Sequence, residues 1–175
     1  MNIFNKVFGG GGQKNKPTSS DESGYNVAEV YSGLRNQVLT TEFDSSESAG
    51  NVIHGVMMET GYENAVVTLV AIADGTISLY FSSGGGVIGA GAHQPVEEVG
   101  KQFRHLATKF MSAMTKTETY PLPTPGNVRF YVLTNRGVYT LEAVEQDLGH
   151  HRHECSPLFH KAHHLIAMIR EHSPE

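Results

Sequence analysis

The chain has 175 residues, a length that allows one sizeable hydrophobic core but not two ordinary domains. Its formal net charge of −5 offers no basic surface to a phosphodiester backbone, so we expect no nucleic-acid binding. The single cysteine, Cys155, cannot form an intramolecular disulfide and fits a reducing compartment. The longest apolar run, residues 65–73, is too short to cross a bilayer, and the first residues lack a signal-peptide pattern. These features predict a cytoplasmic protein without a membrane span.

The chain begins with a short apolar segment and a polar linker. In residues 1–8, four apolar side chains fall at positions i, i+1, i+4 and i+5, which would place them on one side of a short helix. These residues are Ile3, Phe4, Val7 and Phe8. The pattern predicts a docking peptide for a partner or for the protein's own domain, and the alternative is a terminus without function. Residues 9–26 are rich in Gly, Lys and Ser and predict a flexible linker, followed by a single α+β domain over residues 27–175.

A first helix is predicted over residues 27–40, where apolar side chains recur at helical spacing. Asn26 and Glu29 form a capping arrangement at its start. Residues 52–59 form an apolar segment that fits either a short helix or a strand. We prefer a strand for this segment.

A β-hairpin is predicted next, with strands at residues 65–73 and 76–82 joined by the favoured turn pair Asp74-Gly75. A long amphipathic helix then runs from Pro95, which suits a first helical position, to Met114. Its apolar stripe comprises Val96, Val99, Phe103, Leu106, Phe110 and Met114.

Residues 120–126 contain three prolines, which end the long helix. A second hairpin follows, with strands at residues 128–134 and 138–144. The final helix is predicted to begin with Ser156 as N-cap and a proline at the first position, and to end near Glu171.

The element order α-(β)-ββ-α-ββ-α predicts an α+β fold in which two hairpins form one antiparallel sheet of four to five strands with flanking helices. Over residues 27–171 this order resembles the roadblock and longin domains of the profilin-like group. The resemblance implies a dimeric scaffold for protein partners such as small GTPases, although the loop at residues 145–155 replaces a frequent fifth strand. The stretches at residues 78–82, 84–89 and 157–159 are also similar to small bacterial proteins of unknown function.

A glycine-rich stretch follows the first hairpin. Residues 84–89 satisfy the pattern G-x-G-x-x-G, but a dinucleotide site needs a parallel strand–helix–strand unit, which two hairpins do not supply. The backbone amides of this loop could instead form a nest for an anion, and the alternatives are a mobile loop or a close approach of two backbones. The residues of this candidate ligand site are Gly84, Gly85, Gly86, Gly89, Gly91 and His93.

Seven of the ten histidines lie in the last 26 residues, a density that suggests zinc. His160 and His164 are one helical turn apart, and His153 or Cys155 would complete the ligand set from the preceding loop. Against this hypothesis, a helical wheel places His160 and His164 on the solvated face, and the spacing matches no established zinc signature. We therefore predict no cofactor and keep zinc as the alternative.

The sequence contains no catalytic motif, so we predict a protein that is not an enzyme. One face of the sheet carries Tyr80, Arg129 and Tyr131, residue types that are typical of interface anchors, and the alternative is packing under a helix. The leading hypothesis is a protein-interaction or scaffold module that forms a homodimer. The alternatives are a small-ligand or anion-binding protein that uses the glycine loop, and a zinc protein that uses the C-terminal histidines.

Overall fold

The structure is a computed structural model that describes residues 24–43 and 50–173. The helices are α1 (Glu29–Leu39), α2 (Gln94–Ala107), α3 (Glu145–Gly149) and α4 (Ser156–His172), with 3-10 turns at Ala90–Ala92 and Thr108–Ala113. The strands are β1 (Ile53–Gly61), β2 (Val66–Ile72), β3 (Ile77–Phe81), β4 (Gly86–Ile88), β5 (Thr115–Thr117), β6 (Asn127–Thr134) and β7 (Gly137–Val144). The described residues therefore form an α+β fold.

The seven strands form one antiparallel sheet in the order β4-β3-β2-β1-β6-β7-β5. β1 lies at its centre, where Met57 pairs with Val70 of β2 on one side and with Tyr131 of β6 on the other. The turn between β2 and β3 is the predicted Asp74-Gly75 pair, in which the Asp74 carboxylate accepts a hydrogen bond from the amide of Thr76 at 2.8 Å.

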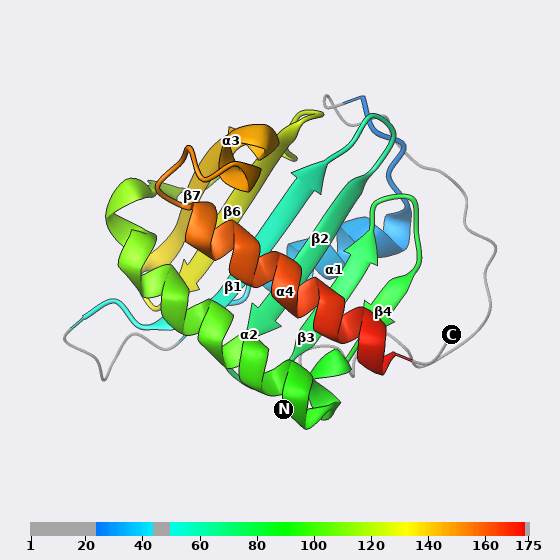
Figure 1. The fold of residues 1–175 in the computed structure, drawn as a ribbon. Helices are drawn as coiled ribbons and strands as arrows, with labels where there is room; N and C mark the ends of the chain where they lie inside the picture. The colour runs from blue at the N-terminus through cyan, green and yellow to red at the C-terminus, as the bar shows by residue number, and fades with distance from the viewer. Residues whose placement is uncertain (1–23, 44–49, 174–175) are drawn as a thin grey trace.

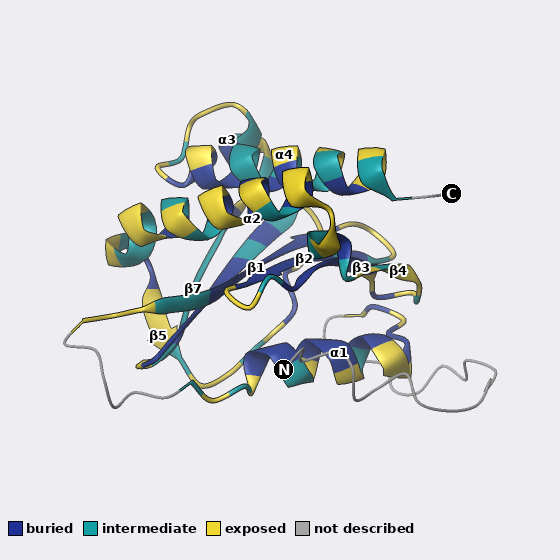
Figure 2. Cartoon of the chain, turned by 90° about the horizontal axis from the view of Figure 1, so that it is seen from below, coloured by how far each residue is buried: buried dark blue, intermediate teal, exposed yellow. Residues whose placement is uncertain are grey.

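Helices cover both faces of the sheet. α2 and α4 lie side by side across one face, whereas α1 lies alone on the opposite face (Figure 1, Figure 2). Because side chains alternate along each strand, β1 sends Val56 and Met58 toward the α2 and α4 layer and Met57 toward α1. Gly100 of α2 packs so closely on Ile77 that a β-carbon there would collide with the isoleucine side chain. The sheet therefore separates two hydrophobic cores.

The strand preferred at residues 52–59 is present as β1, and both predicted hairpins are present. The long helix predicted to reach Met114 ends at Ala107 and continues as a 3-10 turn, and the predicted loop at residues 145–155 contains α3. The predicted strand count was too low, because β4 and β5 occupy the two edges of the sheet. Each has three residues, too few to show the alternation that identifies a strand. The predicted caps were also wrong, since α1 and α4 follow Ala28 and Cys155, and neither makes a side-chain capping bond.

The docking peptide predicted at residues 1–8 lies outside the described residues, as do residues 9–23 of the predicted linker. Within the described residues, no helix is both long and apolar enough to cross a membrane.

Candidate functional site

A buried ion pair lies between α1 and the sheet. Glu59 of β1 is fully buried, and its two carboxylate oxygens accept hydrogen bonds from Arg35 Nε at 2.7 Å and from Arg35 Nη2 at 2.9 Å. Arg35 also donates to the main-chain carbonyl of Pro121 at 3.3 Å. This two-point pairing ties α1 to β1 and gives each buried charge an opposite charge.

Three tyrosines, Tyr31, Tyr80 and Tyr131, lie near this ion pair. The Tyr31 hydroxyl contacts Thr68 Oγ1 at 2.9 Å and donates to Glu59 at 3.4 Å, and Tyr131 donates to the Pro121 carbonyl at 2.6 Å. Burial, and then the Glu59 carboxylate, raise the pKa of Tyr31, Tyr80 and Tyr131 above the ordinary value. These phenols are therefore neutral structural groups rather than acids or bases.

An apolar groove opens beside this cluster, between the start of α1 and the β3–β4 edge of the sheet. Its volume is about 280 Å³, and we refer to it as the α1–β4 groove. Its lining residues are Val30, Tyr31, Leu34, Tyr80, Phe81, Gly84, Gly85, Gly86 and Ile88. Val30, Phe81 and Ile88 are among the exposed large apolar side chains of the described residues, with exposed fractions of 36%, 37% and 36%. The groove thus brings together apolar side chains that are exposed to water.

The glycines of the predicted ligand loop build one wall of this groove. Gly84 donates its amide to the Phe81 carbonyl at 2.9 Å, and Phe81 donates to the Gly85 carbonyl at 3.1 Å, so the segment closes a β-hairpin. Gly86 has φ of +143°, and a β-carbon there would collide with the Leu79 carbonyl oxygen. The glycines are therefore required by the turn and by the close approach of β4 to β3.

The remaining residues of the predicted ligand site lie elsewhere. Gly89 and Gly91 border a separate hollow of about 350 Å³ that also contains the carboxylates of Asp74 and Glu97. His93 is the N-cap of α2 and makes no side-chain capping bond. The two carboxylates make this hollow unfavourable for an anion, and the six predicted residues do not converge on one point.

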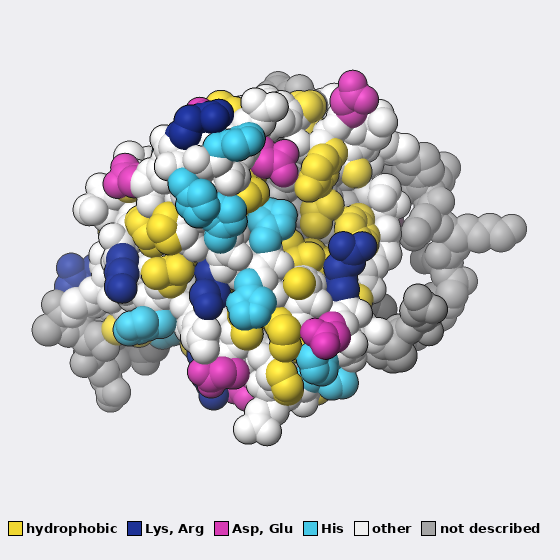
Figure 3. Space-filling view, in the orientation of Figure 1, with side chains coloured by type: hydrophobic (Ala, Val, Ile, Leu, Met, Phe, Trp, Pro, Cys, Tyr) yellow, Lys and Arg dark blue, Asp and Glu magenta, His cyan; other side chains and the backbone are white. Residues whose placement is uncertain are grey.

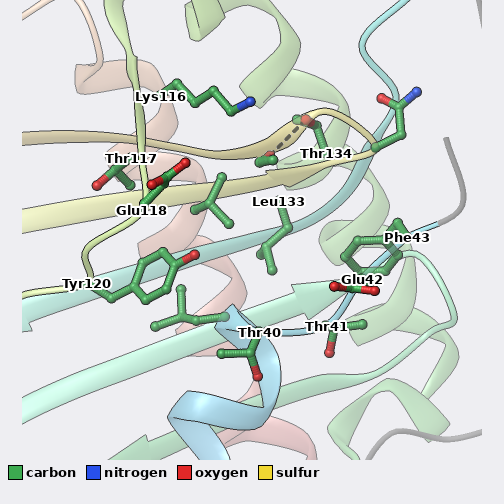
Figure 4. A pocket seen from close by; sticks show the side chains of 14 residues that line it. Thr40, Thr41, Glu42, Phe43, Lys116, Thr117, Glu118, Tyr120, Leu133 and Thr134 are labelled. Atoms are coloured by element: carbon green, nitrogen blue, oxygen red, sulfur yellow. Dashed lines mark hydrogen bonds between the residues drawn. The ribbon is translucent and has the colours of Figure 1, made fainter.

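A larger and more polar cleft of about 580 Å³ lies between the end of α1, β5 and β6 (Figure 4). It contains Lys116 together with the carboxylates of Glu42 and Glu118. The hydroxyls around it are already used, since those of Thr40, Thr41, Thr117 and Thr134 each donate to a main-chain carbonyl at 2.6 to 2.8 Å. These four hydroxyls are therefore not free to donate to a small ligand, and the charged groups that line the cleft are of both signs.

The histidines gather over the face that α2 and α4 cover (Figure 3). His151 and His160 stack with ring centroids 4.3 Å apart, and the His163 ring lies 4.3 Å from that of Phe159. His164 is exposed, and Nδ1 of His153 already accepts the amide hydrogen of Cys155 at 3.1 Å. Within the described residues, no three His, Cys, Asp or Glu side chains are close enough together to hold a metal ion.

Cys155, the fourth ligand of the predicted zinc site, lies inside the core under α4 with no exposed surface. Burial, and then the neighbouring Glu154 carboxylate, raise the pKa of this thiol to about 11. The Cys155 side chain therefore packs among the apolar side chains of the core.

Two of the three predicted interface anchors on the sheet lie in the core under α1. Tyr80 and Tyr131 are 2% and 0% exposed, so neither is available as an exposed anchor in this structure. Arg129 is partly buried and forms an ion pair with Glu142 of β7. The alternative interpretation of these residues was packing under a helix, and this is what the structure shows for Tyr80 and Tyr131.

Several residues of the cluster and the groove were not predicted. The sequence does contain a signal for the Arg35–Glu59 pair. Glu59 is a charged residue in an apolar strand, and Arg35 lies one helical turn after Tyr31, on the same side of the helix. Val30 is one of the apolar side chains at helical spacing in the first helix, and the structure exposes it on the rim of the groove. Ile88 carried no signal, since β4 itself was not predicted.

Comparisons with protein-family models, with curated proteins and with solved structures each find no match to this chain. The resemblance to roadblock and longin domains therefore stays a prediction, and a proposal about function depends on the chemistry of the described residues.

Proposed function

We propose that this protein is an interaction module that binds an apolar segment of a partner protein in the α1–β4 groove. The observation that carries the proposal is the convergence of Val30, Phe81 and Ile88, all exposed, on one apolar hollow. Exposed apolar patches with a defined shape are typical of protein-binding sites.

The size and chemistry of the groove favour side chains over a metabolite. Its volume of about 280 Å³ lies below the range of about 300 to 1,000 Å³ that is usual for small-molecule clefts. No charged side chain lines it, so it offers no attraction to a charged ligand. One or two apolar side chains of a partner would remove Phe81 and Ile88 from water.

The rigidity of the groove supports the same function. Its floor is Tyr80, which packs edge-to-face on Tyr31 with ring centroids 5.6 Å apart. α1 forms another wall of the groove and is tied to β1 by the Arg35–Glu59 pair. A groove with fixed walls loses little conformational entropy when a segment binds.

The test is a peptide-display selection of amphipathic peptides on the full chain. Ile3, Phe4, Val7 and Phe8 are replaced by Ser in this chain so that its own apolar segment does not compete with the added peptide. The selected peptides are then measured by fluorescence anisotropy. We expect the Ile88→Asp substitution to weaken binding at least tenfold, because it places a charge in the groove.

The matched control is Val144→Asp, a substitution at an exposed valine of β7 outside the groove. We expect this variant to bind the selected peptides normally. Equal loss in both variants, or no effect of Ile88→Asp, would contradict the proposed function.

A further inference from the structure

We propose that the protein's own apolar segment, residues 3–8, binds in the α1–β4 groove and competes with the partner segment. This inference rests on the proposed function, because it assigns a competing occupant to the same groove. The segment itself lies outside the described residues, and the argument uses its sequence, its reach and the chemistry of the groove.

The chain enters the described fold next to the groove. The amide of Ala28 donates to the carbonyl of Ser82 at 2.8 Å, and Ser82 directly follows Phe81 of the groove. Val30, two residues further on, is itself a lining residue. Gly24, the first described residue, is six residues from Val30 and therefore at most about 22 Å away from it.

The connecting chain is long enough to bring the segment back. Residues 9–23 separate Phe8 from Gly24, and 15 residues can span up to about 50 Å when extended. This reach exceeds the distance from Gly24 to the groove more than twofold, so the segment can reach the groove without strain.

The chemistry of the segment matches that of the groove. Ile3, Phe4, Val7 and Phe8 are four large apolar side chains within six residues, and the groove presents Val30, Phe81 and Ile88. A hollow between α2 and α4 is a poorer match, because the charged side chains of Glu98, Lys101, Lys109 and Lys161 line it. The α1–β4 groove is therefore the better site for this segment.

Attachment to the same chain gives the segment an advantage over a free partner. A tether of this length corresponds to an effective concentration of about 1 mM. A segment with a dissociation constant of about 0.1 mM would then occupy the groove in about nine tenths of the molecules and weaken a competing peptide about tenfold. Partner binding would thus require displacement of the segment.

Disulfide trapping in the full chain tests this placement. A Val7→Cys, Ile88→Cys double variant is oxidised with glutathione and compared with a Val7→Cys, Val144→Cys variant, in which the second cysteine lies outside the groove. The native Cys155 can remain, because it is fully buried. We expect an intramolecular disulfide that forms at least tenfold faster in the first variant.

Two further comparisons make the test specific. Adding Phe4→Ser and Phe8→Ser to the first variant should slow the disulfide at least tenfold, because both changes remove apolar contacts without touching the described fold. Equal rates for the two cysteine pairs would overturn the inference. Disulfide-linked dimers whose yield rises with protein concentration would also overturn it, since the segment would then belong to a second copy.

The experiments distinguish a failure of this inference from a failure of the proposed function. If the selected peptides bind the native sequence and the Ser-substituted chain equally well, the segment does not compete and only the inference fails. If no peptide binds in the groove of the Ser-substituted chain, the proposed function fails, whereas the trapping experiment still reports whether the segment lies there.

Discussion

Tyr31 of α1 and Tyr80 of β3 pack against each other, but their hydroxyls differ in hydrogen bonding. The Tyr31 hydroxyl has hydrogen-bond partners in Thr68 and Glu59, whereas the Tyr80 hydroxyl has none among the described residues although it is buried. A buried hydroxyl without a partner carries a desolvation cost, and a hydrogen-bonded one contributes to stability. The two rings therefore allow a matched comparison at the level of single atoms.

We expect Tyr80→Phe to raise the free energy of unfolding by about 1 kcal/mol and Tyr31→Phe to lower it by about 1 to 2 kcal/mol. Both substitutions remove one oxygen and keep the ring contact. Urea unfolding followed by circular dichroism measures the difference. If Tyr80→Phe destabilises the protein as much as Tyr31→Phe does, the Tyr80 hydroxyl has a partner in solution.

The Arg35–Glu59 pair gives a second prediction at this scale. Glu59→Gln leaves the Arg35 charge buried without a counter-charge, so we expect a loss of about 3 to 5 kcal/mol in the free energy of unfolding. Replacing both residues by Leu should cost less than this, because no charge remains buried.

The exposed pair between Lys101 and Glu97 of α2 is the matched control, and we expect Glu97→Gln to cost less than about 1 kcal/mol. Urea unfolding of all three variants tests the difference. A Glu59→Gln cost as small as that of Glu97→Gln would show that water screens the buried pair.

At the scale of elements, the β3–β4 hairpin depends on two neighbouring glycines in different ways. Gly85 has φ of +83° with open space around its α-carbon, whereas a β-carbon at Gly86 would collide with the main chain of β3. We expect Gly85→Ala to cost about 1 to 2 kcal/mol, from the left-handed backbone alone, and Gly86→Ala to cost more. Thermal unfolding compares the two variants, and equal costs would contradict the close approach of β4.

The elements that the sequence predicted are those with a local signal. The helical spacing of Val96, Val99 and Phe103 and the turn pair Asp74-Gly75 are each readable from a few neighbouring residues. β4 could not be read in this way, because its three residues become a strand only through pairing with β3.

The groove was still harder to predict, because its rim joins residues that are distant in the sequence. Val30 and Ile88 belong to α1 and β4, and only the folded sheet brings them together. The residues of the zinc hypothesis do not lie together in the described structure, for a related reason. Helical periodicity placed His160 and His164 on one helix, but it could not show that Cys155 lies in the core.

At the scale of the whole molecule, the two faces of the sheet carry different kinds of group. The α1 face holds a buried ion pair and three phenols, whose pKa values are raised above the ordinary value. The opposite face carries the histidines of α4, a residue type that often acts as a pH-sensitive group in proteins. His54 of β1 stacks on Phe43, which packs against the core under α1, so the pH dependence of stability is predicted below for α4 alone.

His163 is the group for which the direction of this dependence can be derived. Its Nε2 is buried and has no hydrogen-bond partner among the described residues. Burial, and then the charge of His160, lower the pKa of His163 below the ordinary value of 6.5. The unfolded chain therefore binds the proton more tightly than the folded protein does, and the folded state is penalised as the pH falls below about 6.5.

Above pH 7 we expect proton binding at His163 to have no effect on the melting temperature. Between pH 7 and pH 5 we expect the melting temperature to fall. His163→Gln should make this fall smaller, because Gln cannot take up a proton. His164→Gln is the matched control, since His164 is exposed on the same helix, and it should keep the full pH dependence. Differential scanning fluorimetry in buffers from pH 5 to pH 8 measures all three proteins. If His163→Gln and the native sequence lose the same number of degrees, the proton that destabilises the fold binds at another group.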